Sequence, residues 1–488
     1  MGPARLLLPA LRWNARTGFD HESAVVEAAL RRGAGGFALF GGEPDAVRQL
    51  TYTTQSRCDY PLLFASDLER GAGQQFTGRT QMPPAGALGF VDDAAVTARA
   101  ARTTALEAHA LGVNWILAPV ADVDTEPRNP IVGTRSFGTR SAHVARHVAA
   151  WVSGCRSTGV LCCAKHFPGH GRTVEDSHSA LPRVAADRHS LEDDLEPFRA
   201  AIAAGVDSIM TAHVVFEALD SDSPATLSPA ILGPLLRTAL GFDGIIVTDA
   251  LNMQGVLDAA GGDARHAAIR ALNAGCDAIL YPAAFSEIAD ALDAELNRSL
   301  SARRVSESLA RVRDAAERAA YSSPAHDDHE DVAESALGTA VRAVSSLRDR
   351  IDLPRAFDLI ILDDDLGGPF PSPSRNSFVD ALRDSGFDVR ATVVASSDRA
   401  AVIAVYSDIR AWKGEPVISE NARASVNAVL AQRPDAVIVL FGHPRLERFL
   451  QGRRLLCAWG GESLMQRAAA RWLALASGRA MPQKAGLQ

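Results

Sequence analysis

Lysine is scarce in this chain of 488 residues, and no stretch is long and apolar enough to form a membrane helix. Only three of the 50 basic side chains are lysine, and the formal net charge at pH 7 is -8. Proteins that bind nucleic acid usually carry a basic patch, so this balance argues against a nucleic-acid partner. A membrane span needs about 18 or more consecutive apolar residues, so we expect no membrane insertion either.

Cysteines are also few, and none of the six belongs to a repeated C-x-x-C pattern. Cys162 and Cys163 are adjacent in an apolar run, which favours free thiols in a reducing compartment over disulfides. Residues 6–8 are leucines, but Pro9 interrupts them and no small-residue cleavage site follows. We therefore expect a cytoplasmic protein. No G-x-G-x-x-G fingerprint appears, and we expect neither a metal nor another cofactor.

Short apolar runs alternate with helical patterns through the first part of the chain. Apolar strands separated by helices are typical of a parallel sheet buried on both faces, and eight such runs match a (β/α)8 TIM barrel. Residues 22–32 illustrate the helical pattern, because Val26, Ala29 and Leu30 share one face. The eight runs are residues 6–11, 36–40, 62–65, 115–120, 160–164, 208–212, 245–247 and 278–281.

The remainder of the chain predicts a second, smaller domain. We expect the barrel to span residues 1–320, a polar and acidic linker to span 321–335, and an open α/β sandwich domain to span 336–488. The pattern again alternates apolar runs with helical stretches. The expected strands are residues 358–362, 389–394, 401–405, 436–441 and 455–459, and the clearest helices are 419–430 and 463–475.

Charged and proton-exchanging residues recur at the carboxyl ends of the predicted barrel strands, where the active sites of TIM barrels lie. A single aspartate at such a place could instead cap the following helix. Five strands of eight that end in this way are harder to explain by capping alone. The residues are Asp67, Asp122, Lys165 with His166, His213 and Asp249.

The stretch from Leu161 to Val184 is the most promising site for chemistry. It contains three histidines, but their spacing across a strand end and a glycine-containing loop differs from the H-E-x-x-H pattern of a zinc site. Asp176 and His178 are two residues apart in an extended segment, so both side chains can point to one side. The carboxylate would then orient the imidazole and raise its pKa, which suits a general acid and base.

Asp249 closes the apolar run 245–247 at the mouth of the predicted barrel. A carboxylate placed opposite an acid/base group is the arrangement of a retaining glycosidase, in which the two groups lie about 5 to 5.5 Å apart. We therefore predict that Asp249 is the nucleophile.

These segments together resemble glycoside hydrolase family 3, in its β-N-acetylglucosaminidase branch. The resemblance covers roughly the first 300 residues in the family's order. It rests on Lys-His-Phe-Pro-Gly-His-Gly at 165–171, Asp-Ser-His at 176–178, and the segments 114–122, 129–138, 210–214, 224–228 and 248–249.

The resemblance implies a role for each matching residue. Asp249 would form a covalent glycosyl-enzyme, and the His178/Asp176 dyad would be the acid and base. Further residues would bind the N-acetylglucosamine unit of a small carbohydrate substrate. They are Asp67, Arg135, Lys165, His166, His213 and Met210.

Three positions depart from the family's pattern. Ala72 and Gln75 stand where arginines would be, and Arg172 stands where the branch usually has an acidic residue. The expected function is a cytoplasmic, cofactor-free exo-β-N-acetylglucosaminidase that retains configuration and acts on peptidoglycan fragments from cell-wall recycling, as a monomer or homodimer. Two alternatives stay open: a phosphorylase that releases N-acetylglucosamine 1-phosphate, and an inactive sugar-binding sensor.

Overall fold

The computed structural model describes residues 2–177, 180–320, 332–366 and 373–479, so most of the expected linker lies outside the described residues. The chain divides into two compact units. Unit 1 contains residues 1–81, 93–126 and 136–330, and unit 2 contains residues 82–92, 127–135 and 331–488. Two short segments within the stretch expected to be the barrel domain are thus grouped with unit 2.

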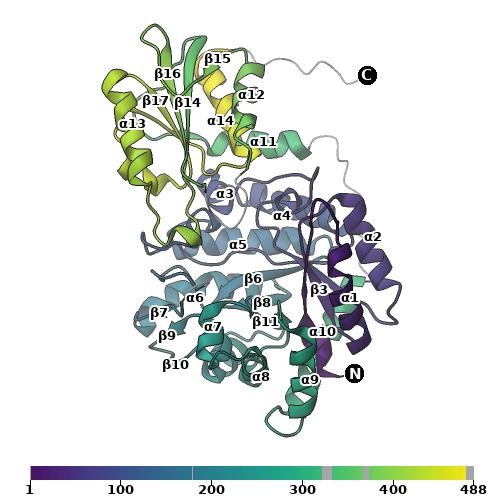
Figure 1. The fold of residues 1–488 in the computed structure, drawn as a ribbon. Helices are drawn as coiled ribbons and strands as arrows, with labels where there is room; N and C mark the ends of the chain where they lie inside the picture. The colour runs from purple at the N-terminus through teal and green to yellow at the C-terminus, as the bar shows by residue number, and fades with distance from the viewer. Residues whose placement is uncertain (1, 178–179, 321–331, 367–372, 480–488) are drawn as a thin grey trace. The chain divides into compact units, whose positions relative to one another are not determined.

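Unit 1 is built on a curved parallel sheet (Figure 1). All eight predicted runs form strands, and their burial on both faces explains why they are apolar throughout. The strands are β1 (Leu7–Leu8) and β2 (Ala10–Arg12), which share the first run, then β3 (Gly36–Phe40), β4 (Leu63–Ser66), β5 (Trp115–Ile116), β6 (Leu161–Phe167), β8 (Ser208–Thr211), β11 (Ile245–Thr248) and β12 (Ile279–Leu280).

The first apolar run closes these strands into a ring. Seven strands pair in the order β11-β8-β6-β5-β4-β3-β2, and β1 pairs with β12. A parallel bridge between Val247 and Ala278 joins β11 to β12. The predicted TIM-barrel fold is therefore confirmed.

Helices follow the barrel strands, and local signals define their ends. Gly33, at φ 75°, ends α1, while Asp93 and Asp187 accept backbone N–H bonds at the starts of α4 and α6. The helices are α1 (Ser23–Arg32), α2 (Pro44–Gln55), α4 (Ala94–His109), α5 (Ser141–Arg156), α6 (Arg188–Ala203), the π-helical η6 (Ile231–Ala239), α7 (Gln254–Ala259), α8 (Ala264–Ala274), α9 (Phe285–Glu295) and α10 (Ala302–Ala320).

Unit 1 also contains short elements that the periodicity did not predict. The strands β7 (Arg183–Val184), β9 (Val215–Phe216) and β10 (Asp220–Pro224) form a small sheet of their own. Short runs such as these carry too little periodic signal to be read from sequence. The single-turn helices are η1 (Pro3–Leu6), η2 (Asp20–Glu22), η3 (Ala72–Gln74) and η5 (Ala225–Leu227).

Unit 2 contains a six-stranded sheet in the order β13-β18-β17-β16-β14-β15, parallel except for the edge strand β13. This is the order of an open, doubly wound sheet. The strands are β13 (Ser345–Ser346), β14 (Ala356–Asp363), β15 (Asp388–Ala391), β16 (Ala400–Tyr406), β17 (Val437–Phe441) and β18 (Arg454–Cys457).

Helices cover both faces of this sheet (Figure 1). Val426 of α13 packs against Ile403 and Ile438 on one face, whereas Phe378 of α12 meets the Phe441 ring on the other. The second predicted domain type is therefore present. The helices of unit 2 are α3 (Ala85–Val91), η4 (Gly133–Arg135), α11 (Val332–Ala343), α12 (Asn376–Asp384), η8 (Ala411–Lys413), α13 (Glu420–Gln432), η9 (Pro444–Phe449) and α14 (Ser463–Ala476).

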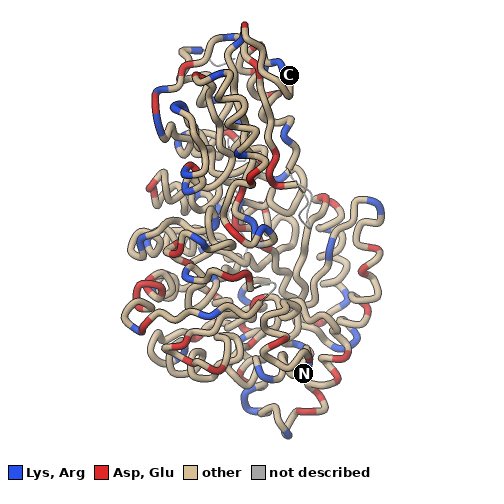
Figure 2. The backbone as a smooth tube through the Cα atoms, turned by 60° about the vertical axis from the view of Figure 1, so that its left-hand side comes forward, with Lys and Arg blue, Asp and Glu red and all other residues tan. Residues whose placement is uncertain are grey.

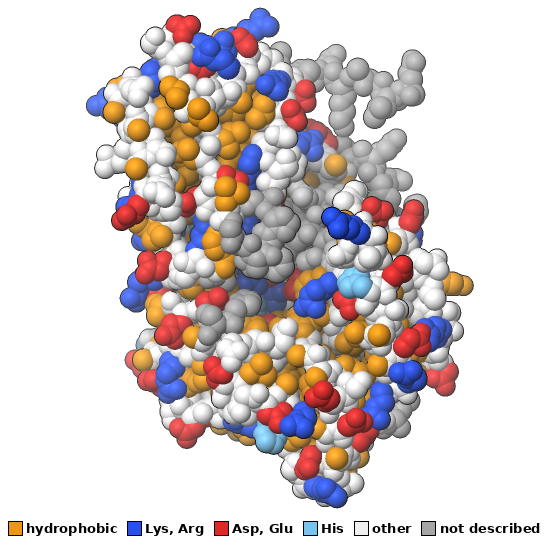
Figure 3. All heavy atoms as spheres, in the orientation of Figure 1, with side chains coloured by type: hydrophobic (Ala, Val, Ile, Leu, Met, Phe, Trp, Pro, Cys, Tyr) orange, Lys and Arg blue, Asp and Glu red, His pale blue; other side chains and the backbone are white. Residues whose placement is uncertain are grey.

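Charges of both signs are interspersed along the backbone of each unit (Figure 2). The space-filling view shows the same mixture on the face that it displays (Figure 3). Among the helices of the described residues, none is long and apolar enough to cross a bilayer.

Candidate active site

The carboxyl ends of the barrel strands carry the charged residues that the sequence singled out. Asp67 follows β4, Lys165 and His166 lie near the end of β6, and Asp249 follows β11. Parallel strands bring their carboxyl ends to one edge of the barrel, so these residues share that edge.

Lys165 is the centre of the first cluster at this edge. Its ammonium group lies 2.6 Å from Asp67 Oδ1 and 2.8 Å from Glu69 Oε1, and its side chain is only 3% exposed. A compact ammonium carries three donors, so it can serve both carboxylates at once. Glu69 was not predicted as a site residue, because its role depends on this contact across the barrel.

Tyr281 is a site residue that sequence reasoning missed. It follows β12, and its hydroxyl group donates to Asp67 Oδ2 at 3.2 Å. Burial is the main cause that raises the pKa of Tyr281 well above its usual value, and the charges of Asp67 and Asp249 add to the effect. The phenol therefore stays a donor, and Asp249 lies near enough to act on it. A tyrosine is uncharged at neutral pH, so the search for charged and proton-exchanging residues at strand ends did not identify it.

His166 is oriented by a buried carboxylate. Its Nδ1 lies 2.7 Å from Asp122 Oδ2, and its backbone N–H donates to Asp122 Oδ1 at 3.1 Å. Burial opposes the ionisation of Asp122, yet His166 and His170 hold the pKa of this carboxyl below its usual value. Because Asp122 fixes Nδ1 as the donor, the histidine can offer Nε2 to a sugar hydroxyl.

His170 belongs to the same network but plays a different part. Its backbone N–H donates to Asp122 Oδ1 at 2.7 Å, its Nδ1 pairs with Thr173 Oγ1 at 2.9 Å, and its Nε2 pairs with Ser177 Oγ at 3.0 Å. The Thr173 hydroxyl group already donates to the His170 carbonyl, so Nδ1 must donate to Thr173 and Nε2 must accept from Ser177. Burial lowers the pKa of His170 to about 4. The ring is thus neutral, as these bonds require.

Asp249 is partly exposed, and its Oδ1 accepts the N–H of Ala250 at 2.7 Å. His213 supports the same segment, because its Nε2 donates to the Ala250 carbonyl at 3.1 Å. Its Nδ1 pairs with Thr226 Oγ1 at 2.7 Å. Both ring nitrogens of His213 therefore bond within the chain, next to the predicted nucleophile.

The other predicted site residues are placed as follows. Met210 is buried in β8, at the register position paired with Val247 of β11. Arg135 ends η4 in the segment 127–135, which belongs to unit 2. Asp176 is partly exposed, and its carbonyl accepts from the Ala180 N–H. His178 lies outside the described residues.

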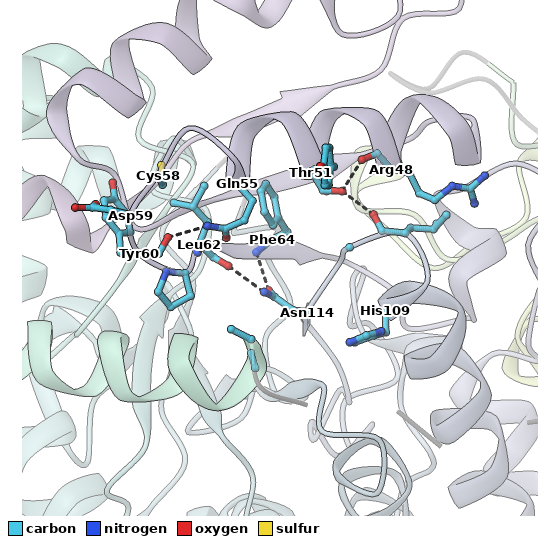
Figure 4. Close-up of a pocket in the computed structure, with 16 residues that line it drawn as sticks. Arg48, Thr51, Gln55, Cys58, Asp59, Tyr60, Leu62, Phe64, His109 and Asn114 are labelled. Carbon is cyan, nitrogen blue, oxygen red and sulfur yellow. Dashed lines mark hydrogen bonds between the residues drawn. The ribbon is translucent and has the colours of Figure 1, made fainter. Parts of the chain in front are cut away.

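A cavity of about 650 Å³ lies at the opposite, amino-terminal end of the barrel (Figure 4). Its amide side chains are engaged by the backbone: Gln55 bonds Tyr60 and Leu62, and Asn114 bonds Leu62 and Phe64. These bonds tie together the segment that enters β4. The cavity is therefore a structural feature of the barrel floor rather than a second site for chemistry.

The acidic run 363–365 in unit 2 is neutralised by cations of the chain itself. Arg375 makes a two-pronged contact with Asp363 at 2.8 and 2.9 Å. The ammonium of Lys413 lies 2.8 Å from Asp365 and 3.7 Å from Asp364. This arrangement accounts for the acids as part of an ion-pair network.

A family model supplies the decisive comparison. The Glycosyl hydrolase family 3 N terminal domain matches residues 42–315, which contain the barrel strands from β4 to β12. The chain belongs to glycosyl hydrolase family 3. The family expected from the motifs is confirmed.

Two relatives of this family 3 chain are named as β-hexosaminidases. It is 37% identical over 297 residues to a β-hexosaminidase of Methylococcus capsulatus, which covers 57% of this chain and 86% of the relative. It is 34% identical over 325 residues to β-hexosaminidase A of Pseudoalteromonas piscicida, over 59% of this chain. That match spans only 54% of the Pseudoalteromonas protein.

A solved structure matches both units of the family 3 chain. It is a glycoside hydrolase family 3 β-N-acetylglucosaminidase from Paenibacillus sp. str. FPU-7, with a TM-score of 0.84 and 27% identity. The match covers 97% of this chain and 96% of that one. The two-part architecture is thus shared with this β-N-acetylglucosaminidase structure.

Proposed function

We propose that this protein is a retaining exo-β-N-acetylglucosaminidase that removes terminal N-acetylglucosamine from peptidoglycan-derived fragments or related β-linked oligosaccharides. The observation that carries the proposal is the edge of the barrel, where Asp249 lies beside the Asp67, Lys165 and Tyr281 cluster. The names of the relatives support the choice of sugar.

In the proposed mechanism Asp249 attacks the anomeric carbon and forms a covalent glycosyl-aspartate. His178, oriented by Asp176, protonates the departing oxygen and then deprotonates the water that hydrolyses the intermediate. Asp67, Lys165 and His166 hold the hydroxyls of the terminal sugar. Both ring nitrogens of His213 already bond within the chain, so His213 supports the Ala250 segment beside Asp249 instead. Sugar contacts by Arg135 and Met210 stay predictions. Histidine is cationic as the acid and neutral as the base, so in neither form does it repel the anionic nucleophile, which suits a histidine in this place.

The test is turnover of 4-nitrophenyl N-acetyl-β-D-glucosaminide beside the corresponding glucoside, with and without phosphate, with identification of the sugar product. Selective release of free N-acetylglucosamine is expected. A phosphate-dependent sugar phosphate would instead identify a phosphorylase. Binding without turnover would identify a sensor.

The role of His178 needs a separate measurement. The His178→Ala variant should lose about 10²- to 10⁴-fold on substrates with sugar leaving groups, because general acid catalysis is worth that much. It should lose far less in kcat/KM on aryl glycosides, whose leaving groups need little protonation. Equal losses on both substrates would remove His178 as the acid.

A further inference from the structure

The loop after β6 contains an arginine whose side chain is bound to a neighbouring helix. Arg172 Nε donates to Asp194 Oδ2 at 2.5 Å, and its Nη2 donates to the Ser190 carbonyl at 2.8 Å. Both acceptors lie in α6. Two bonds from one rigid guanidinium fix orientation as well as distance, so they hold the loop in one register on the helix.

Asp194, the partner of Arg172 on α6, is buried and only partly satisfied by hydrogen bonds. Its side chain is 3% exposed, and within the described residues its Oδ1 has no hydrogen-bond partner. Burial raises the pKa of Asp194 to about 6, although Arg172 favours the charged form. A half-satisfied buried carboxylate is costly, and among the described residues the side chain that bonds this one is the loop arginine.

The loop and the helix are also in close contact at Gly169. This residue has φ 137°, and a Cβ added to it would lie 3.0 Å from Asp194 Cβ. A side chain at this position would therefore push the loop away from α6. Glycine and the Arg172 contact together keep the start of the loop against the helix.

The same loop is fixed a second time, near its far end. The neutral His170 ring accepts from the Ser177 hydroxyl group, and its own backbone is held by Asp122. Arg172 lies between His170 and Ser177 in the sequence. The segment 169–177 thus has one anchor inside the barrel edge and one on α6.

We propose that Arg172 is a positioning residue for the acid/base loop, and that its contacts with Asp194 and Ser190 set the place from which Asp176 approaches the substrate. The inference rests on the proposed function, because it assumes that this loop supplies the acid and base. An acidic residue at position 172, as the resembled branch usually has, would face Asp194 with like charge. The pair is therefore a feature of this chain's own loop and helix.

The test compares two substrates of the full-length protein: 4-nitrophenyl N-acetyl-β-D-glucosaminide, and chitobiose, whose leaving group needs protonation. The Arg172→Met variant should lose about 10- to 100-fold in kcat/KM on chitobiose, as expected for a displaced catalytic group. On the aryl glycoside it should stay within about threefold. Arg172→Lys, which keeps the charge near Asp194 but loses the fork, should show a smaller loss with the same preference.

Arg199→Met is the matched control, because Arg199 pairs with Glu192 on the exposed surface of the same helix. It should leave both activities unchanged. The wild type could be active while Arg172→Lys and Arg172→Met lose kcat/KM equally on both substrates, or on neither. That result would overturn the positioning role alone. A wild type that cleaves neither substrate would overturn the proposed function and this inference with it.

Discussion

The two ends of the barrel differ in how accessible their carboxylates are. At the amino-terminal end, Asp277 is fully buried, and donors surround both of its oxygens: Arg304, Ser308 and the Ile246 N–H bond it, with Arg237 completing the set. Such a group has no capacity for a ligand. It ties the floor of the barrel together.

At the carboxyl end, Asp67 and Asp249 are bonded to the chain but remain accessible, whereas Asp122 is buried there in support of His166. Asp67 contacts Lys165 and Tyr281, yet its side chain remains 25% exposed. Asp249 is partly exposed as well, and one of its oxygens accepts the Ala250 N–H. The same chemical group therefore serves structure at one end of the strands and is available to a substrate at the other.

The sharpest test of this contrast is Asp249→Ala. Loss of a nucleophile should lower kcat on N-acetylglucosaminides by at least about 10³-fold. Stability should change little, because the carboxylate is partly exposed. The measurements are single-turnover kinetics and thermal unfolding, and turnover close to that of the wild type would remove Asp249 as nucleophile.

The opposite outcome is expected for Asp277→Asn. Removing the charge leaves the half-buried guanidinium groups of Arg237 and Arg304 without their fully buried anionic partner, which should cost about 3–5 kcal/mol in the free energy of unfolding. Urea denaturation measures the loss, and kcat per folded molecule should match the wild type. A fall in kcat without a loss of stability would contradict the division between the two ends.

Two buried groups near the carboxyl end should give opposite pH dependences of stability. The pKa of His170 is lowered to about 4, so its contribution is present above the unfolded value near 6.5 and is lost as pH falls through about 4. The pKa of Asp194 is raised to about 6, so its contribution is present below about 3.8 and is lost as pH rises through about 6.

Each of these effects is worth about 3 kcal/mol at most, and between about pH 4 and 6 they oppose one another. Removing Asp194 with Asp194→Asn should leave the dependence of His170, so the free energy of unfolding should rise more steeply from pH 4 to 6 than in the wild type. Denaturant titrations at several pH values provide the comparison. An unchanged slope would show that Asp194 does not titrate in this range.

The smallest effect is expected at the cavity in the barrel floor. Asn114→Ala removes the bonds to Phe64 N and Leu62 O, at 2.8 and 2.9 Å, and should cost about 1–3 kcal/mol with kcat unchanged. Asn273→Ala is the control, because Asn273 is exposed and makes one bond to Ser299 O. A loss of activity in Asn114→Ala that is absent in Asn273→Ala would show that this cavity contributes to function, against the division between the two ends of the barrel.

The fold was predictable because its signals are local and repeated. Each barrel strand is an apolar run buried on both faces, and each is followed by a helical pattern, so eight repeats specify the barrel even where single boundaries are uncertain. The grouping of residues 82–92 and 127–135 with unit 2 was not predictable. It depends on packing between segments far apart in the chain.

The site was predictable only in part, for the same reason. Strand-end position identified Asp67, Lys165 and Asp249, since parallel strands bring such residues to one edge. Residues whose importance comes from a partner gave no such signal: Glu69 and Tyr281 meet their partners only across the barrel.

The sequence by itself therefore determined the alternation of strands and helices, the family, and the types of side chain at the barrel edge, because these depend on neighbours in the chain. Only the tertiary structure decided which polar groups bond within the protein and which are accessible to a substrate. His213 shows this most clearly, since both of its ring nitrogens bond to residues of other segments. Hydrogen-bond partners are chosen by proximity in space, and a strand-end position does not reveal them.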